Sequence, residues 1–213
     1  MVAALGKRVS RGRQQRGSRV RASLGLRPAF YIDTLRYIST LQYGSVSMTT
    51  AGTTIESPRI GQTISFVRTA ADTAGSELVI EAVMRPGAFL PPHIHVRQDE
   101  HFEILTGTAT FTVGGQKIIA EPGEQLNVPA GVAHRFRNSS AADVRIRGTL
   151  RPALRTEELF ERLFRLGAAG RVNRLGAPNP WVTAALIREF REEFFYLAGV
   201  PIAVQRLLAG ARP

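Results

Sequence analysis

Four side chains between residues 93 and 134 are of types that bind metal ions, and their spacing could bring them together. His93 and His95 are two residues apart. Alternate side chains on an extended strand share a face, so both imidazoles point the same way. Glu100 follows after a short turn, and His134 begins a β-rich run behind the turn at 129–131. Three imidazoles and one carboxylate directed into one interior predict a site for a divalent transition metal.

The ligand types leave the identity of this ion open. Fe, Mn, Ni, Cu and Zn all accept nitrogen-rich sites with one carboxylate. Four protein ligands leave about one or two positions of a six-coordinate ion for water, a substrate or O₂. A metal with an open position can polarise a substrate, activate water or hold O₂ beside a substrate.

Strand alternation excludes two neighbouring side chains of suitable type from the predicted metal site. His101 and Glu103 lie one and three residues beyond Glu100, so they belong to the opposite face of the strand. A register slip of one residue would turn Glu103 inward and Glu100 outward. Phe102 and Ile104 alternate with Glu100 on the apolar face, which argues against that slip.

Short strands must position these residues. Many short strands at even spacing favour a sandwich or a barrel. Gly114-Gly115 predicts a two-residue hairpin turn, because a type I′ turn needs a positive φ at both positions. The β-rich runs are Ile64–Val67, Glu77–Met84, Phe102–Leu105, Thr108–Val113, Lys117–Ala120, Gln125–Val128, His134–Arg137 and Val144–Leu150.

Ten residues stand at fixed spacing in two sets: Gly87, His93, His95, Glu100 and Gly107, and then Gly123, Pro129, Gly131, His134 and Asn138. These sets resemble the two sequence motifs of the cupin superfamily, in its small single-barrel form. The resemblance covers about residues 60–150. It implies an all-β double-stranded β-helix (a jelly-roll barrel) over 58–150, with the two histidines of the pair, the glutamate and the last histidine as metal ligands.

The inward-facing positions of these strands predict an apolar and aromatic pocket around the metal. Such a lining suits an aromatic, ketone or polyketide-like molecule better than a charged sugar phosphate. The predicted pocket residues are Phe89, Phe102, Ile104, Phe111, Leu126, Val128 and Phe136.

The leading functional hypothesis is a metal-dependent dioxygenase that acts on a small apolar or aromatic molecule, similar to the flavonol and diketone dioxygenases among cupins. Glu100 would be a ligand and also the catalytic base that deprotonates an enol or hydroxyl. Two alternatives remain: a metal-assisted isomerase or decarboxylase, and a cupin that binds a small molecule without catalysis. The fold by itself does not choose among them.

Residues 151–213 change to a helical period and predict a C-terminal helical extension. One apolar stripe lies in Thr156–Leu166. Asn179-Pro180 predicts the start of a second helix, whose apolar positions continue to Leu197 and which ends at Gly199. A third helix is expected after Pro201. We expect these helices to pack on the barrel or on a partner subunit, and the alternatives are a lid over the barrel mouth or a membrane contact.

The positive charge of the chain, +11 overall, is concentrated at its N-terminus. Residues 1–47 contain nine Lys or Arg and one acidic residue, Asp33, so this segment carries a net charge of +8. Three interpretations remain open for it: a disordered basic arm, a transit peptide, and sequence upstream of a true start at Met48. We expect no nucleic-acid partner, because the remaining residues carry a net charge of only +3.

The rest of the composition limits the class of protein further. The chain has no cysteine, which excludes disulfides and thiolate ligands. No run of 18 apolar residues predicts a membrane span, and we expect a cytoplasmic protein. Uncovered sheet edges are a liability, so we also expect a homodimer formed through the N-terminal strand or the helices.

Overall fold

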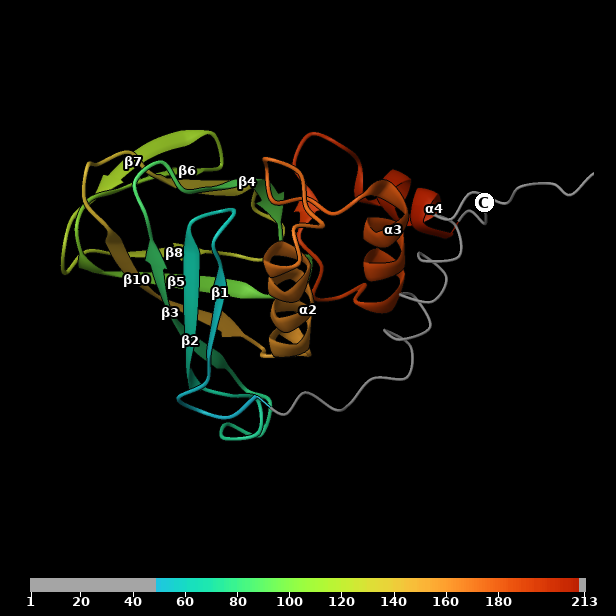
Figure 1. The fold of residues 1–213 in the computed structure, drawn as a ribbon, viewed down its shortest axis with the longest axis horizontal. Helices are drawn as coiled ribbons and strands as arrows, with labels where there is room; N and C mark the ends of the chain where they lie inside the picture. Colours follow the sequence, from blue (N-terminus) through green and yellow to red (C-terminus); the bar gives the residue numbers. More distant parts are fainter. Residues whose placement is uncertain (1–48, 211–213) are drawn as a thin grey trace, which may run out of the picture.

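The computed structural model describes residues 49–210, so the expectations for the basic segment 1–47 lie outside the described residues. Within 49–210 the chain forms eleven strands and three helices (Figure 1). The strands are β1 (Thr54–Ser57), β2 (Gln62–Arg68), β3 (Leu78–Met84), β4 (Phe89–Ile94), β5 (Asp99–Thr106), β6 (Ala109–Val113), β7 (Gln116–Ala120), β8 (Gln125–Val128), β9 (His134–Asn138), β10 (Val144–Arg151) and β11 (Tyr196–Leu197). The helices are α2 (Thr156–Ala168), α3 (Pro180–Glu189) and α4 (Ile202–Gly210).

The strands form two antiparallel sheets. One has the order β1-β2-β3-β10-β5-β8 and the other the order β11-β4-β9-β6-β7. Strands distant in sequence therefore become neighbours, such as β3 with β10 and β4 with β9. The helices gather at one end of this barrel, with α2 nearest to the strands (Figure 1). The predicted all-β jelly-roll barrel with C-terminal helices is confirmed.

Alternation along the strands builds the core between the two sheets. In β9 the residues His134, Phe136 and Asn138 are buried, while the two residues between them are exposed. The same period in β5 buries Phe102 and Ile104. Because side chains alternate across a strand, each sheet turns one apolar face inward and one polar face outward.

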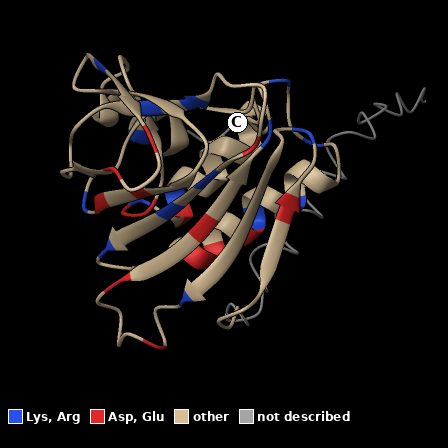
Figure 2. Ribbon diagram, turned by 90° about the vertical axis from the view of Figure 1, so that its left-hand side faces the viewer, with Lys and Arg blue, Asp and Glu red and all other residues tan. Residues whose placement is uncertain are grey.

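The outward faces carry paired charges of both signs. Arg147 on β10 contacts Glu81 on β3 and Glu103 on β5, each at 2.9 Å. Arg145 contacts Glu81 at 3.0 Å. Figure 2 shows acidic and basic segments along the same strands. The described barrel therefore presents mixed charge on this face, as expected when the excess basicity belongs to the N-terminal segment.

Two turns illustrate why glycine occurs where the strands reverse. Gly114 and Gly115 have φ values of +56° and +89°, which confirms the predicted hairpin turn between β6 and β7. Gly107 has a φ of +76°, and a Cβ at this position would lie 2.8 Å from the carbonyl oxygen of Asp143. Gly107 therefore satisfies two demands at once, a left-handed backbone and a close approach to another strand.

The C-terminal extension contains the three predicted helices, and only the predicted end of the second helix differs from the structure. Helix α2 begins at Thr156, and α3 begins after Asn179, whose side chain accepts a hydrogen bond from the backbone N–H of Val182. Helix α4 follows Pro201. The apolar side chains of α4 that face solvent include Leu207 and Leu208. Among the described residues, no helix has the length and apolar character needed to cross a membrane.

The prediction that the second helix continues through Leu197 is wrong. Helix α3 ends at Glu189, and Tyr196 and Leu197 form β11, which pairs with Ile94 and His93 of β4. Tyr196 is fully buried, and its hydroxyl donates to the carbonyl oxygen of Arg191 at 3.0 Å. Pairing with an open sheet edge and burial of an aromatic ring outweigh a helical period in the sequence.

We predict that Gly107→Ala lowers the free energy of unfolding by about 2–4 kcal/mol, because the new methyl group needs both a strained backbone and a displaced strand. Gly123→Ala is the control, since Gly123 also has a positive φ but no atom within 4 Å of a built Cβ. It should cost about 1 kcal/mol. Urea unfolding of both variants measures the difference, and equal losses would contradict the close-approach argument.

Candidate metal centre

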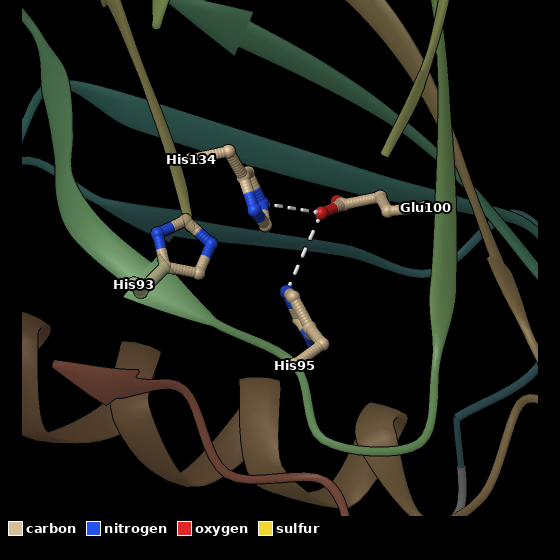
Figure 3. A group of neighbouring side chains, drawn as sticks. All are labelled: His93, His95, Glu100 and His134. Carbon is tan, nitrogen blue, oxygen red and sulfur yellow. Dashed lines mark hydrogen bonds and ion pairs between the residues drawn. The ribbon is translucent and has the colours of Figure 1, made fainter. Parts of the chain in front are cut away.

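The four predicted ligands meet inside the barrel. His93 lies near the end of β4, His95 directly after it, Glu100 on β5 and His134 at the start of β9. One nitrogen or oxygen atom from each side chain lies within 4.8 Å of those of the other three, and all four residues are buried. Figure 3 shows the three imidazoles and the carboxylate converging from three strands. This group of atoms could hold one metal ion.

Strand pairing brings the two halves of the group together. His93 and His134 are direct partners in the β4–β9 ladder, and their ring centroids are 4.2 Å apart. The backbone N–H of Gly131 donates to the carbonyl oxygen of His95 at 2.8 Å. This hydrogen bond links the turn before His134 to the end of β4, so the two sequence motifs are in direct contact at the site.

Hydrogen bonds to the backbone orient two of the imidazoles. Nδ1 of His93 donates to the carbonyl oxygen of Pro91 at 2.8 Å, and Nδ1 of His134 donates to that of Val132 at 3.1 Å. A carbonyl can only accept, so Nδ1 carries a proton in both residues, and a metal would have to bind at Nε2. Nδ1 of His95 is buried without a hydrogen-bond partner among residues 49–210.

The carboxylate of Glu100 is the electrostatic centre of the group. Its Oε2 lies 3.0 Å from Nε2 of His134 and 3.3 Å from Nε2 of His95. Burial alone would raise the pKa of Glu100, but the hydrogen bonds from His134 and His95 and their charges outweigh it, and the pKa lies well below its usual range. Glu100 is therefore ionised at neutral pH.

The histidines respond to the same surroundings in opposite ways. Burial, reinforced by the two neighbouring imidazoles, lowers the pKa of His93 to about 3. Burial also acts to lower the pKa of His134, but its hydrogen bond to Glu100 reverses the effect and raises that pKa. One buried anion thus faces three imidazoles, at least one of which is neutral, and this donor set suits a divalent cation.

A second set of contacts holds the loop between His95 and Glu100. The side-chain amide of Gln98 donates to the carbonyl oxygens of Pro152 and Ala153 at 2.9 and 3.2 Å. It also donates to Oγ1 of Thr156 at 2.7 Å. The loop that carries two candidate ligands is therefore anchored to the beginning of α2. Sequence reasoning missed Gln98, whose residue type gives no signal of this role.

A cavity of about 230 Å³ opens beside the four ligands and is lined by His93, His95 and Glu100 among others. Three predicted pocket residues line it, namely Phe89, Phe102 and Phe136. The other four, Ile104, Phe111, Leu126 and Val128, pack together in the barrel core and are not among the lining residues. Phe111, for example, packs behind two rings that line the cavity, with its centroid 5.1 Å from that of Phe102 and 5.4 Å from that of Phe136.

Comparison with known proteins assigns the central part of this barrel to a family. The family model described as "Cupin domain" matches residues 80–148. The chain contains a cupin domain. All four candidate ligands lie inside the matched segment, and so do the strands from which they project.

Curated relatives match the cupin domain over short stretches. Quercetin 2,3-dioxygenase of Bacillus subtilis is 33% identical over 94 residues, which is 44% of this chain and 26% of that protein. The xanthan biosynthesis protein XanB of Xanthomonas campestris pv. campestris is 33% identical over 55 residues, 26% of this chain and 12% of XanB. The chain therefore spans about a quarter or less of these relatives.

Solved structures of similar proteins include KdgF from Halomonas sp. and an RmlC-like cupin from Shewanella frigidimarina. The first has a TM-score of 0.40 and 20% identity over 43% of this chain and 79% of that one. The second has a TM-score of 0.42 and 18% identity over 52% of this chain and 94% of that one. The fold of this chain is defined by the strand order of its own two sheets.

Residues beyond the cupin domain supply much of the cavity wall. Phe160, Leu163 and Phe164 come from α2 and Ile187 from α3. Phe194 and Phe195 come from the segment before β11. Phe195 reaches the site itself, with its ring centroid 4.9 Å from that of His95. The sequence placed this segment in a helix, so its part in the site was not predicted.

The remaining predictions around the motifs can be placed as well. Nδ1 of His101 lies 2.7 Å from Oδ1 of Asn127, and Glu103 pairs with Arg147 on the outer face. Both lie outside the group of candidate ligands. Asn138 is buried and donates to the carbonyl oxygens of Met84 and Ala142, in the structural role expected for it.

Proposed function

We propose that the protein is a metal-dependent dioxygenase that acts on a small, uncharged, apolar or aromatic molecule. One observation carries this proposal: a buried group of three histidines and one glutamate opens into a cavity whose lining among the described residues includes no Lys, Arg or Asp. The other polar lining residues are Ser57, Gln62, Thr183 and Gln205. Away from the candidate ligands, a charged group of a substrate would lack a counter-ion there, whereas an apolar ring would be well accommodated.

His93, His95, Glu100 and His134 are the proposed ligands of one divalent transition metal, either Fe, Mn, Ni, Cu or Zn. The donor set fits such an ion, because the backbone bonds of Nδ1 leave Nε2 of His93 and His134 as the nitrogens that would bind it, with the metal replacing the proton that His134 donates to Glu100. When bound, the metal would supply an open position where a substrate oxygen and O₂ can be held together.

Glu100 is proposed both as a ligand and as the catalytic base. Its carboxylate is ionised, so it can accept a proton. Substrates with an acidic proton suit this role, such as the enol of a β-diketone or a phenolic hydroxyl. The similarity to quercetin 2,3-dioxygenase, 33% over 94 residues, supports the same class of substrate.

We predict that the purified protein takes up roughly one equivalent of a divalent metal per chain. His134→Ala should weaken the affinity by on the order of 100-fold or more, since loss of a residue that merely supports a ligand typically costs 10–100-fold. His101→Ala is the control, because it removes a histidine of the same strand region that points elsewhere. Elemental analysis and competition with a chelator measure both, and an equal loss in the two variants would refute the assigned site.

We further predict O₂ consumption by the metal-loaded protein with a flavonol or a β-diketone. Glu100→Gln should reduce kcat by on the order of 100-fold or more, because it removes the proton acceptor and one anionic ligand. Glu103→Gln should retain activity, since its carboxylate lies on the outer face. Oxygen-electrode measurements decide this. A loaded protein that consumes no O₂ with any of these substrates would exclude the dioxygenase and favour an isomerase, a decarboxylase or a binding protein.

The homodimer inferred from the sequence remains a proposal. Among residues 49–210, β1 is an edge strand of the larger sheet, and exposed apolar side chains such as Leu207 lie on α4. Either surface would be covered in a dimer. Size-exclusion chromatography with light scattering should give twice the chain mass of 23.3 kDa, and a monomer at working concentration would refute it.

A further inference from the structure

Phe195 links the C-terminal extension directly to the candidate metal centre. Its ring centroid lies 4.9 Å from that of His95 and 5.5 Å from that of His93. On its other side the centroid lies 5.6 Å from that of Phe160 on α2. Phe195 also lines the cavity. One aromatic ring therefore contacts two candidate ligands and forms part of the wall that a bound molecule would touch.

The backbone on either side of Phe195 is firmly held. Tyr196 and Leu197 pair with β4 opposite Ile94 and His93. The side chain of Gln205 accepts from the N–H of Leu197 and donates to its carbonyl oxygen, both at 3.0 Å. In Figure 3 the red-brown strand of this segment runs close to His93, on the same side as α2. The ring is thus positioned by the same strand pairing that positions a candidate ligand.

The packing of Phe195 leaves part of its ring available. It contacts both the hydrophobic cluster of the helices and the cluster between α2 and the larger sheet, yet it is only half-buried. A ring that served packing alone would bury both faces, as Phe66 does in the second of these clusters. The accessible part of Phe195 adjoins the cavity beside the candidate ligands.

We propose that Phe195 is a specificity-determining residue that selects substrates carrying an aromatic ring directly next to their metal-binding oxygens. This inference rests on the function proposed above. When the enol or ketone oxygens of such a substrate bind the metal, the aromatic ring conjugated to them would lie against Phe195. Aromatic pairs favour offset or edge-to-face contacts and add about two- to tenfold in affinity beyond their burial. The substrate class is therefore an aryl ketone or aryl enol.

The test uses two probes with the same chelating oxygens. Benzoylacetone and acetylacetone are both β-diketones, but a phenyl group in the first replaces a methyl group of the second. Binding to the Co²⁺-loaded full chain is measured without O₂ from the change in enolate absorption. The wild type should prefer benzoylacetone. Phe195→Leu should weaken benzoylacetone about fivefold and leave acetylacetone within about twofold.

A matched variant and a second measurement separate specificity from structure. Phe66→Leu makes the same change in a cluster shared with Phe195, but Phe66 does not line the cavity. It should leave the preference between the probes unchanged. Co²⁺ affinity should stay within about threefold in Phe195→Leu, because a phenyl ring does not bind the metal and gives the candidate ligands no hydrogen bond of the kind whose loss costs metal affinity. Phe195→Met, which preserves volume, replaces Phe195→Leu if that variant does not fold.

Each result then has one meaning. A lost preference with normal Co²⁺ affinity supports the role of Phe195. Equal weakening of both probes, the same change in Phe66→Leu, or loss of Co²⁺ from the Phe195 variants would overturn it and make the residue structural. A wild type that binds both probes equally would also overturn it. Failure of the wild type to bind Co²⁺ at all would instead refute the proposed metal site on which the inference depends.

Discussion

The antiparallel pairing of β4 with β9 is the constraint on which the site depends. It places His93 opposite His134, although 41 positions separate them in the sequence. The hydrogen bond from the backbone N–H of Gly131 to the carbonyl oxygen of His95 holds the same two segments together just beyond the ladder. Without this ladder the histidines on β4 and β9 would not meet, and the buried carboxylate of Glu100 would lose its hydrogen bond from His134, which is unfavourable for a buried charge.

The electrostatics of the site follow from that burial. An ionised carboxylate in an apolar interior needs compensation, and two imidazoles provide it through hydrogen bonds to one oxygen of Glu100. The backbone bonds of His93 and His134 leave their remaining nitrogens directed toward the same point. A site organised around one buried anion and three imidazoles is suited to a cation, and the apolar cavity beside it is suited to an uncharged ligand.

The C-terminal extension is part of this arrangement although the matched cupin segment ends at residue 148. Helix α2 receives the side chain of Gln98 and so holds the loop between two candidate ligands. Strand β11 extends the smaller sheet at β4 and carries Phe195 to the imidazoles. The barrel provides the ligands, while the extension shapes the space next to them. Differences in substrate among related barrels could therefore arise outside the barrel itself.

The sequence by itself determined the barrel, the four candidate ligands and their faces. Strand alternation separated Glu100 from His101 and Glu103, because a period of two leaves no intermediate orientation. Only the tertiary structure decided which inward residues line the cavity and which fill the core: Phe102 does the first and Phe111 the second, though both alternate correctly. The position of Phe195 was also beyond sequence reasoning. An apolar helical period predicted a longer α3, but Tyr196 and Leu197 pair with the edge strand β4 as a short strand. Which segment pairs with an edge strand is determined only when the fold is assembled, so the local sequence does not show it.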